Sequence, residues 1–209
     1  IKILTPALFE GKKKISKLFE SKPFKGKKIV MMVNRMVKEK GVYDVLYGWN
    51  LFIKKNNKHD TVLVCVGSGK EKNNMVRLVR KLGLEQVVFF LEHIGNDELR
   101  SLYSQGHCLV LGSLVTPLWQ EQFGYVLAES INEGCPVIST YSGAIPEVVG
   151  SAGILVPPGN PPAIATALES MEDENVHLYL KKECKKESEK FSHTKFAQDV
   201  SKLYLDLIT

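Results

Sequence analysis

The sequence predicts an α/β fold, a Rossmann-like doubly wound parallel sheet of about six strands followed by C-terminal helices. Two observations support this prediction. Six short β-type runs recur along the 209 residues, and helical patterns joined by short loops separate them. Most of the runs are continuously apolar rather than alternating, as expected for a parallel sheet that is covered on both faces.

The individual elements follow from these patterns in chain order. The predicted strands are Lys28–Val33, Thr61–Val66, Gln86–Leu91, His107–Leu111, Pro136–Thr140 and Gly153–Val156. Apolar residues recur on one face of the predicted helices, which are Gly41–Asn57, Lys70–Leu82, Asp97–Ser104, Phe123–Glu133 and Pro161–Met171. The fourth helix ends at Gly134 with Pro136 beyond it, a typical stop signal. The tail from Glu172 to Thr209 is also helical by pattern.

Positive charge gathers at the start of the chain. Residues 1–40 hold twelve Lys or Arg and three Glu, within a net charge of +5 for the whole sequence. This segment could contact nucleic acid or an anionic membrane surface, but a solvated segment is the favoured interpretation. No apolar run approaches the roughly 18–20 residues that a membrane-spanning helix needs, and no signal-peptide pattern opens the chain.

The cysteines indicate neither a disulfide framework nor a metal site. Cys65, Cys108, Cys135 and Cys184 form no C-x-x-C pair, and no histidine stands at metal-ligand spacing from them. Cys65 and Cys108 fall in apolar runs and are predicted to be buried thiols. A reducing, cytoplasmic location is therefore expected.

Ligands of such sheets bind beyond the carboxyl ends of the strands. Four predicted loops lie there: Asn34–Gly41, Gly67–Lys70, Glu92–Asn96 and Gly112–Gly124. The first carries Arg35 and Lys40, two cations that suit a diphosphate, although a solvated loop would explain them equally well. The Gly67-Ser68-Gly69 sequence lacks P-loop spacing and is interpreted as a tight turn beside the site.

Two carboxylates, Glu121 and Glu129, bracket the start of the predicted fourth helix. Eight residues of helix would rise about 12 Å, roughly the length of a sugar nucleotide. Gly124 would let the backbone approach a ligand closely, and the first helical turn could hold a phosphate. Two solvated surface glutamates are the alternative interpretation.

In combination, these segments resemble family 4 of the retaining glycosyltransferases. The resemblance rests on motifs in one order: NRMVKEKG at 34–41, VCVGSG at 64–69, FFLEHI at 89–94, Glu121-x7-Glu129, GCPVIST at 134–140 and GILVPPG at 153–159. It is dense over residues 28–170 and implies one half of a GT-B fold, the nucleotide-sugar-binding C-terminal domain. Residues 27–209 would form this domain and residues 1–26 an interdomain linker, with the N-terminal GT-B domain absent.

The resemblance also implies roles for particular residues. Glu121 would bind the donor sugar as the catalytic residue, and Glu129 would bind the ribose. The donor diphosphate would meet Arg35, Lys40 and the backbone of Phe123, Gly124 and Tyr125, and the base would meet His93 and Ile94. Asn34 and Glu92 stand where the family usually has glycine, and Glu92 puts the contact with the base in question.

We therefore predict a donor-binding domain that takes a nucleotide diphosphate sugar and needs no cofactor or metal. No Asp-x-Asp motif lies in a candidate loop, whereas two cations and a helix N-terminus can stabilise a departing diphosphate. The expected partners are the donor, the missing N-terminal domain, and an acceptor glycan, lipid or protein. The basic lead-in, residues 1–26, could contact a membrane peripherally, whereas nucleic acid is not expected. A sugar-nucleotide epimerase and a non-catalytic nucleotide-binding module are the alternatives.

Overall fold

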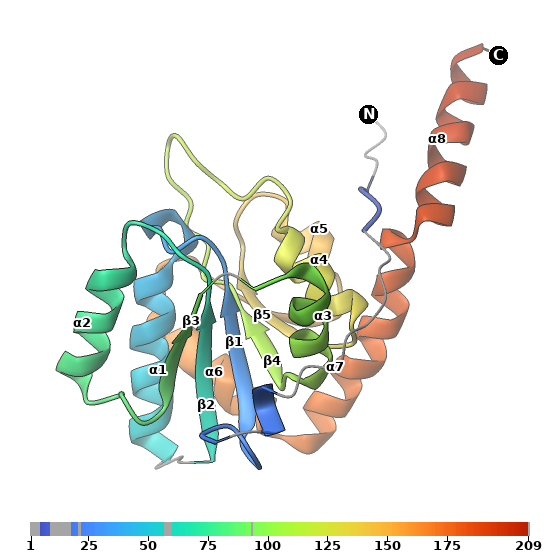
Figure 1. The fold of residues 1–209 in the computed structure, drawn as a ribbon. Helices are drawn as coiled ribbons and strands as arrows, with labels where there is room; N and C mark the ends of the chain where they lie inside the picture. The colour runs from blue at the N-terminus through green and yellow to red at the C-terminus, as the bar shows by residue number, and fades with distance from the viewer. Residues whose placement is uncertain (1–4, 9–17, 21, 57–59, 93, 209) are drawn as a thin grey trace.

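The computed structural model describes residues 5–8, 18–20, 22–56, 60–92 and 94–208. It confirms the predicted fold class, since six parallel strands form one sheet in the order β3-β2-β1-β4-β5-β6 (Figure 1). The strands are β1 Lys28–Val33, β2 Thr61–Val66, β3 Val88–Leu91, β4 Cys108–Val110, β5 Val137–Thr140 and β6 Gly153–Val156. The longer helices are α1 Val42–Asn56, α2 Lys72–Leu82, α3 Asn96–Gln105, α4 Tyr125–Asn132, α5 Ile145–Val149, α6 Pro161–Met171, α7 Glu174–Glu187 and α8 His193–Ile208.

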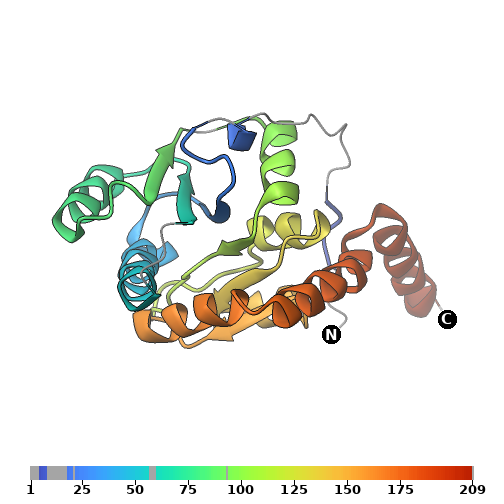
Figure 2. The ribbon, with the colours of Figure 1, turned by 90° about the horizontal axis from the view of Figure 1, so that it is seen from below.

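Helices cover both faces of the sheet, which explains the continuously apolar strands. On one face α1, α2 and α6 pack over a core that contains Trp49 and Phe52. On the other face α3, α4 and α5 pack over a second core that includes Leu102 and Tyr103. Helix α7 runs from α6 toward α4, and α8 extends away from the body (Figures 1 and 2).

Three local differences from the predicted elements have clear causes. Strand β3 begins at Val88 because the backbone N–H groups of Val87 and Val88 both donate to Leu84 O in a turn. Helix α4 begins at Tyr125, since Gly124 adopts a left-handed conformation with φ of 84°. The short α5 was not predicted, and it tolerates Pro146 because a proline in the first helical turn gives up no intrahelical hydrogen bond.

The strand order reverses between β1 and β4, and there the loops that follow these two strands touch. Gly41 has a φ of 62°, and a Cβ added to it would lie 1.8 Å from Gly112 O. Only glycine permits both this conformation and this approach. The contact brings the loop with Arg35 and Lys40 against the loop with Glu121, at the place where doubly wound sheets bind ligands.

The described parts of the lead-in pack against this body. The Leu8 backbone N–H donates to Phe191 O at 3.0 Å, and the Phe24 ring meets the Phe89 ring edge-on at 5.1 Å between centroids. The lysine run at 12–14, predicted as a possible membrane contact, lies outside the described residues. In the described part of the chain, every helix is too short or too polar to cross a membrane.

Candidate functional site

A buried ion pair between Lys40 and Glu121 lies at the centre of the candidate site. Lys40 Nζ is 2.5 Å from Glu121 Oε2, and Ser113 Oγ donates to the same oxygen at 2.8 Å. Glu121 is 8% exposed, so its charge is largely removed from water. Lys40 ends a short 3-10 turn, Lys38–Lys40, that closes the loop after β1. Two segments distant in sequence thus meet through opposite charges.

The loop after β5 fixes the backbone on both sides of Glu121. The Glu121 backbone N–H donates to Ser142 Oγ at 3.2 Å, and the Ser142 hydroxyl donates to Leu114 O at 2.8 Å. Glu121 O accepts from the Ala144 N–H at 3.0 Å. At Gly143, where φ is 55°, a Cβ would lie 1.9 Å from Glu121 O. The carboxylate is therefore held in place before any ligand arrives.

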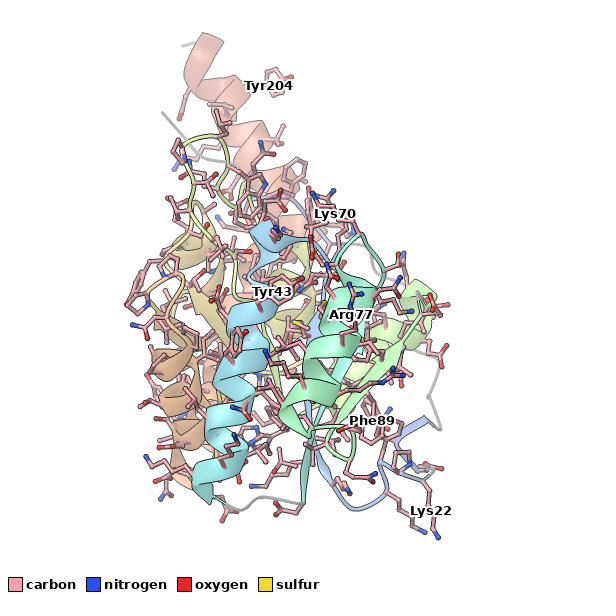
Figure 3. The ribbon with its side chains drawn as sticks, turned by 90° about the vertical axis from the view of Figure 1, so that its left-hand side faces the viewer. Lys22, Tyr43, Lys70, Arg77, Phe89 and Tyr204 are labelled. Atoms are coloured by element: carbon pink, nitrogen blue, oxygen red, sulfur yellow. The ribbon has the colours of Figure 1, made fainter. Side chains whose placement is uncertain are left out.

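Three cations share one pocket beside this ion pair. Arg35, Lys40 and Lys70 line a cavity of about 250 Å³, together with Val37, Glu39 and Trp119. Lys70 follows β2, and Figure 3 shows it above Arg77, far from Lys22. The sequence predicted the meeting of Arg35 and Lys40, but it did not place Lys70 with them. The grouping of positive charge makes this cavity suited to an anion.

Trp119 forms the aromatic wall of the same cavity. Its ring centroid lies 5.1 Å from Lys40 Nζ, within the range of a cation–π contact. A backbone bridge between Thr116 and Trp119 closes a small hairpin, with N–H to O distances of 2.8 and 3.2 Å. Trp119 therefore helps to orient the lysine that Glu121 neutralises.

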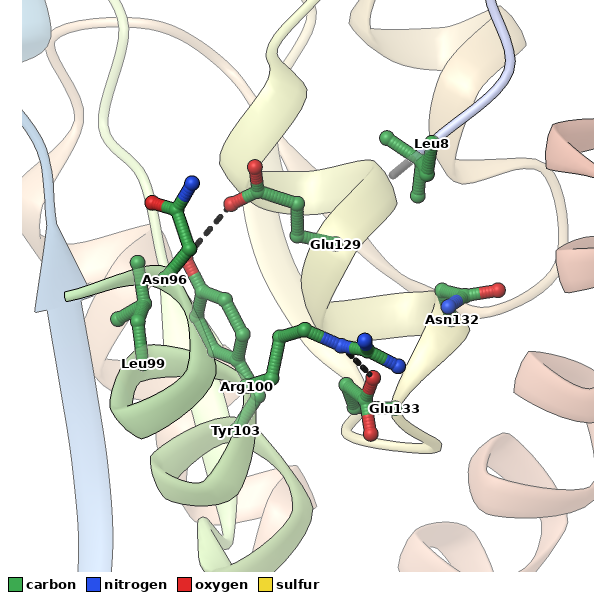
Figure 4. A pocket seen from close by; sticks show the side chains of 8 residues that line it. All are labelled: Leu8, Asn96, Leu99, Arg100, Tyr103, Glu129, Asn132 and Glu133. Carbon is green, nitrogen blue, oxygen red and sulfur yellow. Dashed lines mark hydrogen bonds and ion pairs between the residues drawn. The ribbon is translucent and has the colours of Figure 1, made fainter. Parts of the chain in front are cut away.

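Glu129 lies in a second, smaller cavity of about 40 Å³ between α3 and α4 (Figure 4). The Tyr103 hydroxyl donates to Glu129 Oε2 at 3.3 Å. Burial raises the pKa of the Glu129 carboxyl, and the hydrogen bond from Tyr103 opposes this shift. Arg100 and Glu133 form an ion pair at 2.7 Å lower in the same cavity, and Asn96 lies at its other end.

The structure brings some of the predicted site residues together and separates others. Arg35 and Lys40 line one cavity, Glu121 pairs with Lys40, and a Cβ on Gly124 would lie 3.6 Å from Glu121 Cγ. Glu129 lines the cavity between α3 and α4, and Glu121 is not among the residues that line it. The 12 Å helical rise is wrong as a measure of their separation, because only residues from Tyr125 onward are helical.

The remaining predicted residues lie around the start of α3 and α4. Tyr125 is exposed, whereas the Phe123 ring packs edge-on against Tyr125 and Phe191. Ile94 packs on the core just before α3, and Asn96 two residues later reaches the cavity of Glu129. His93 lies outside the described residues.

Sequence reasoning missed the residues that support the predicted ones. Lys70 directly follows the Gly67-Ser68-Gly69 turn, so its place beyond a strand end was a usable signal. Ser113, Ser142 and Tyr103 carried no such signal, because they act through contacts between segments far apart in the chain.

The cysteines and the acidic residues form no metal site in the described part of the chain. No group of three or more His, Cys, Asp or Glu side chains there could hold a metal ion. All four cysteines are free and buried, as predicted for Cys65 and Cys108, and burial raises the pKa of the Cys135 thiol to about 12.

The decisive comparison is with known families. Residues 14–191 match the family described as glycosyl transferases group 1. This chain belongs to that family. The chain is 28% identical over 181 residues to the glycosyltransferase MJ1607 of Methanocaldococcus jannaschii, covering 85% of this chain and 44% of that protein. It is 30% identical over 185 residues to the N-acetyl-alpha-D-glucosaminyl L-malate synthase of Bacillus anthracis, covering 87% and 46%.

Among solved structures, the group 1 domain resembles Anabaena Alr3699/HepE, determined in complex with UDP and glucose. The TM-score is 0.76 at 21% identity, over 90% of this chain and 50% of that one, so the likeness concerns the fold. The chain spans less than half the length of the glycosyltransferase relatives. These comparisons agree with the Rossmann-like sheet described above.

Proposed function

We propose that this chain is the donor-binding domain of a retaining, metal-independent glycosyltransferase of family 4. The observation that carries the proposal is the cavity at the reversal of strand order, where Arg35, Lys40 and Lys70 converge beside the buried Glu121. Such a cavity suits a diphosphate with a sugar attached, because cations and a hydroxyl-binding carboxylate lie next to each other. Membership of the group 1 glycosyl transferases supports the same conclusion.

The cations would stabilise the leaving group. When the bond between the sugar and the diphosphate breaks, negative charge grows on the departing phosphate oxygens. The guanidinium of Arg35 and the ammonium groups of Lys40 and Lys70 would meet this charge, and the N-terminus of α4 would add its partial positive charge. The departing phosphate would accept the proton of the acceptor hydroxyl, as the resemblance to retaining enzymes implies.

Glu121 would act on the sugar while it compensates Lys40. Its Oε2 already accepts from Lys40 and Ser113, and its backbone is fixed by Ser142. A carboxylate held in this way can accept hydrogen bonds from sugar hydroxyls without reorienting. When the diphosphate also binds Lys40, the interaction between Lys40 and Glu121 would weaken. The Glu121 carboxylate, still in the same place, would then accept stronger hydrogen bonds from the sugar hydroxyls.

The nucleoside would lie toward α3. Glu129 would accept hydrogen bonds from the ribose hydroxyls, with Ile94 and Asn96 near the base. The Anabaena structure holds UDP and glucose, so a UDP-sugar is the first donor to test. The acceptor would bind between this domain and a second one.

Calorimetric titration of the chain with UDP, ADP and GDP, and with UDP-, ADP- and GDP-sugars, tests the proposal. One nucleotide is expected to bind with equal affinity in EDTA and in Mg²⁺. Lys40→Ala should weaken binding by about 1.5–3 kcal/mol, the range for hydrogen bonds to charged groups. Lys55→Ala is the matched control, since Lys55 pairs with Glu169 on the surface and its side chain is 70% exposed.

Two results would overturn the proposal. If none of the three nucleotides or their sugars bound, the proposal of a donor site at this edge of the sheet would be rejected. A loss of affinity on chelation, restored by Mg²⁺ or Mn²⁺, would reject the metal-independent mechanism and leave the family membership intact.

A further inference from the structure

We propose that Tyr103 is a positioning residue, whose hydroxyl holds the Glu129 carboxylate ready for the ribose of the donor. The inference rests on the proposed function, because it takes Glu129 as the residue that binds ribose. It adds a residue that lies behind the site and acts through another side chain.

The geometry joins the Tyr103 hydroxyl to the Glu129 carboxylate. Tyr103 is fully buried from solvent in the second core, where it lines the cavity between α3 and α4. Its hydroxyl is 3.3 Å from Glu129 Oε2, and Figure 4 shows the ring and the carboxylate facing each other across the two helices. Among the described residues, Tyr103 is the one whose side chain donates a hydrogen bond to the Glu129 carboxylate.

A ribose-binding carboxylate has two requirements that the hydroxyl would meet. It must keep one orientation, so that both ribose hydroxyls can donate to it, and it must stay ionised. Burial works against the second requirement because it raises the pKa of Glu129, whereas the bond from Tyr103 lowers it. Burial also raises the pKa of the Tyr103 phenol, so this group remains a donor near neutral pH.

The other charged or titratable groups around the cavity have different partners or surroundings in the described part of the chain. Arg100 of α3 and Glu133 of α4 pair with each other, and Leu8 from the lead-in is apolar. Asp97 and Glu98 in the first turn of α3 are exposed. Cys135 lies near Tyr103, and burial raises the pKa of its thiol to about 12. None of these groups changes in a Tyr103→Phe variant.

The test compares Tyr103→Phe with the unaltered protein and with Tyr43→Phe. Tyr43 is a matched control because its hydroxyl also donates to a glutamate, Glu71, at the start of α2. Binding of UDP, ADP and GDP and of their 2′-deoxy counterparts is measured between pH 5 and pH 8.5. The ratio of the ribo to the deoxy affinity reports the contact between Glu129 and ribose.

We expect the unaltered protein to prefer the ribonucleotide by roughly 10- to 100-fold, the equivalent of one hydrogen bond to a charged group. Tyr103→Phe should reduce this preference by about 3- to 10-fold. It should also move the loss of binding in acid to higher pH, because Glu129 without its donor takes up a proton more readily. Tyr43→Phe should change neither quantity.

A second variant keeps the test decisive if Tyr103→Phe does not fold. Replacement of Tyr103 by 4-fluorophenylalanine fills the space of the hydroxyl without supplying a donor to Glu129, and it should also lower the preference for ribose. An unchanged preference and pH profile in Tyr103→Phe, together with a lost preference in Glu129→Gln, would overturn the role of Tyr103 alone. If the unaltered protein bound no ribonucleotide, or Glu129→Gln kept the preference, the ribose assignment itself would fall.

Discussion

Lys40 enters the site with its charge already compensated. The Glu121 carboxylate lies 2.5 Å away, and both side chains are mostly buried, at 15% and 10% exposure. Removing one member of a buried pair leaves the other without compensation, which is costly in the free energy of unfolding. The same removal, however, makes the survivor available to a ligand of opposite charge. Substitutions at Glu121 should therefore affect the sugar and the diphosphate differently.

Glu121→Gln should weaken binding of the intact nucleotide sugar by about 1.5–3 kcal/mol, because it would remove the charged acceptor that we propose for the sugar hydroxyls. The free diphosphate should bind as tightly as before or more tightly, since Lys40 no longer has an internal partner. Glu129→Gln should weaken both ligands alike, because both contain ribose. Calorimetry of donor and diphosphate on both variants separates these outcomes. Equal losses in Glu121→Gln, or no loss in either variant, would contradict the assigned roles.

At the scale of the elements, the loops after β1 and β4 form one unit through Gly41 and Gly112. Gly41→Ala should lower the free energy of unfolding by about 3 kcal/mol, combining left-handed strain with a clash against Gly112 O. Gly83→Ala is the control, because Gly83 has a φ of 70° with no atom within 4 Å of an added Cβ, and should cost about 1 kcal/mol. Urea denaturation measures both changes. Equal losses of unfolding free energy in the two variants would show that the backbone at Gly112 moves aside for the added methyl group at little energetic cost.

His107, just before β4, should make stability depend on pH. Burial and the neighbouring His177 lower its pKa from 6.5 to about 4, while Nε2 lies 3.0 Å from Met171 O. The unfolded chain then binds a proton more readily, so stability is lost as the pH falls below 6.5. The loss between pH 7.5 and pH 5 should be about 2 kcal/mol.

Urea unfolding of His107→Gln at these two pH values checks this expectation. The glutamine amide can replace the hydrogen bond without titrating, so the variant should lose less stability in acid than the unaltered protein. His193→Gln, which changes an exposed histidine in α8, should behave like the unaltered protein. Parallel pH dependence in all three proteins would exclude His107 as the source.

The elements themselves were largely predictable, because strand and helix periods are local properties of the sequence. Strands β1, β2 and β6 have the predicted bounds, since apolar runs with clear turn residues at both ends define them. The start of α4 was not predictable, because the conformation of Gly124 depends on the contacts of its loop. Pro146 concealed α5, as proline usually argues against a helix.

On the scale of the whole molecule, the chain should fold cooperatively and bind a donor, yet transfer no sugar by itself. The sheet has six strands and helices cover both of its faces, but the chain spans less than half the length of its relatives. A single urea transition together with nucleotide binding is expected. Product formation is measured with a radiolabelled UDP-sugar and simple acceptors. Robust transfer by residues 1–209 would show that one domain suffices.

The candidate site could be predicted only in part, because several of its contacts join segments that are far apart in the sequence. The order of strands and loops placed Arg35, Lys40 and Glu121 near one edge of the sheet. The ion pair of Lys40 with Glu121 depends on how the loops that follow β1 and β4 pack together. The position of Lys70 in the same cavity depends on how the loop after β2 packs beside them. Tyr103 depends on the packing of α3 on α4. Such contacts have no signature in a single segment.

Arg35, Lys40, Lys70, Glu121 and Glu129 belong to neither of the two hydrophobic cores. Substitutions at Arg35 and Lys70 would therefore alter the charge of the cavity without opening a core, whereas Lys40 and Glu121 would have to change together, because each compensates the other. Lineages that inherit this sheet could exchange one donor for another through a few substitutions in its loops. The division between an apolar interior and charged loops at its edge would give a physical basis for one scaffold to accept different ligands.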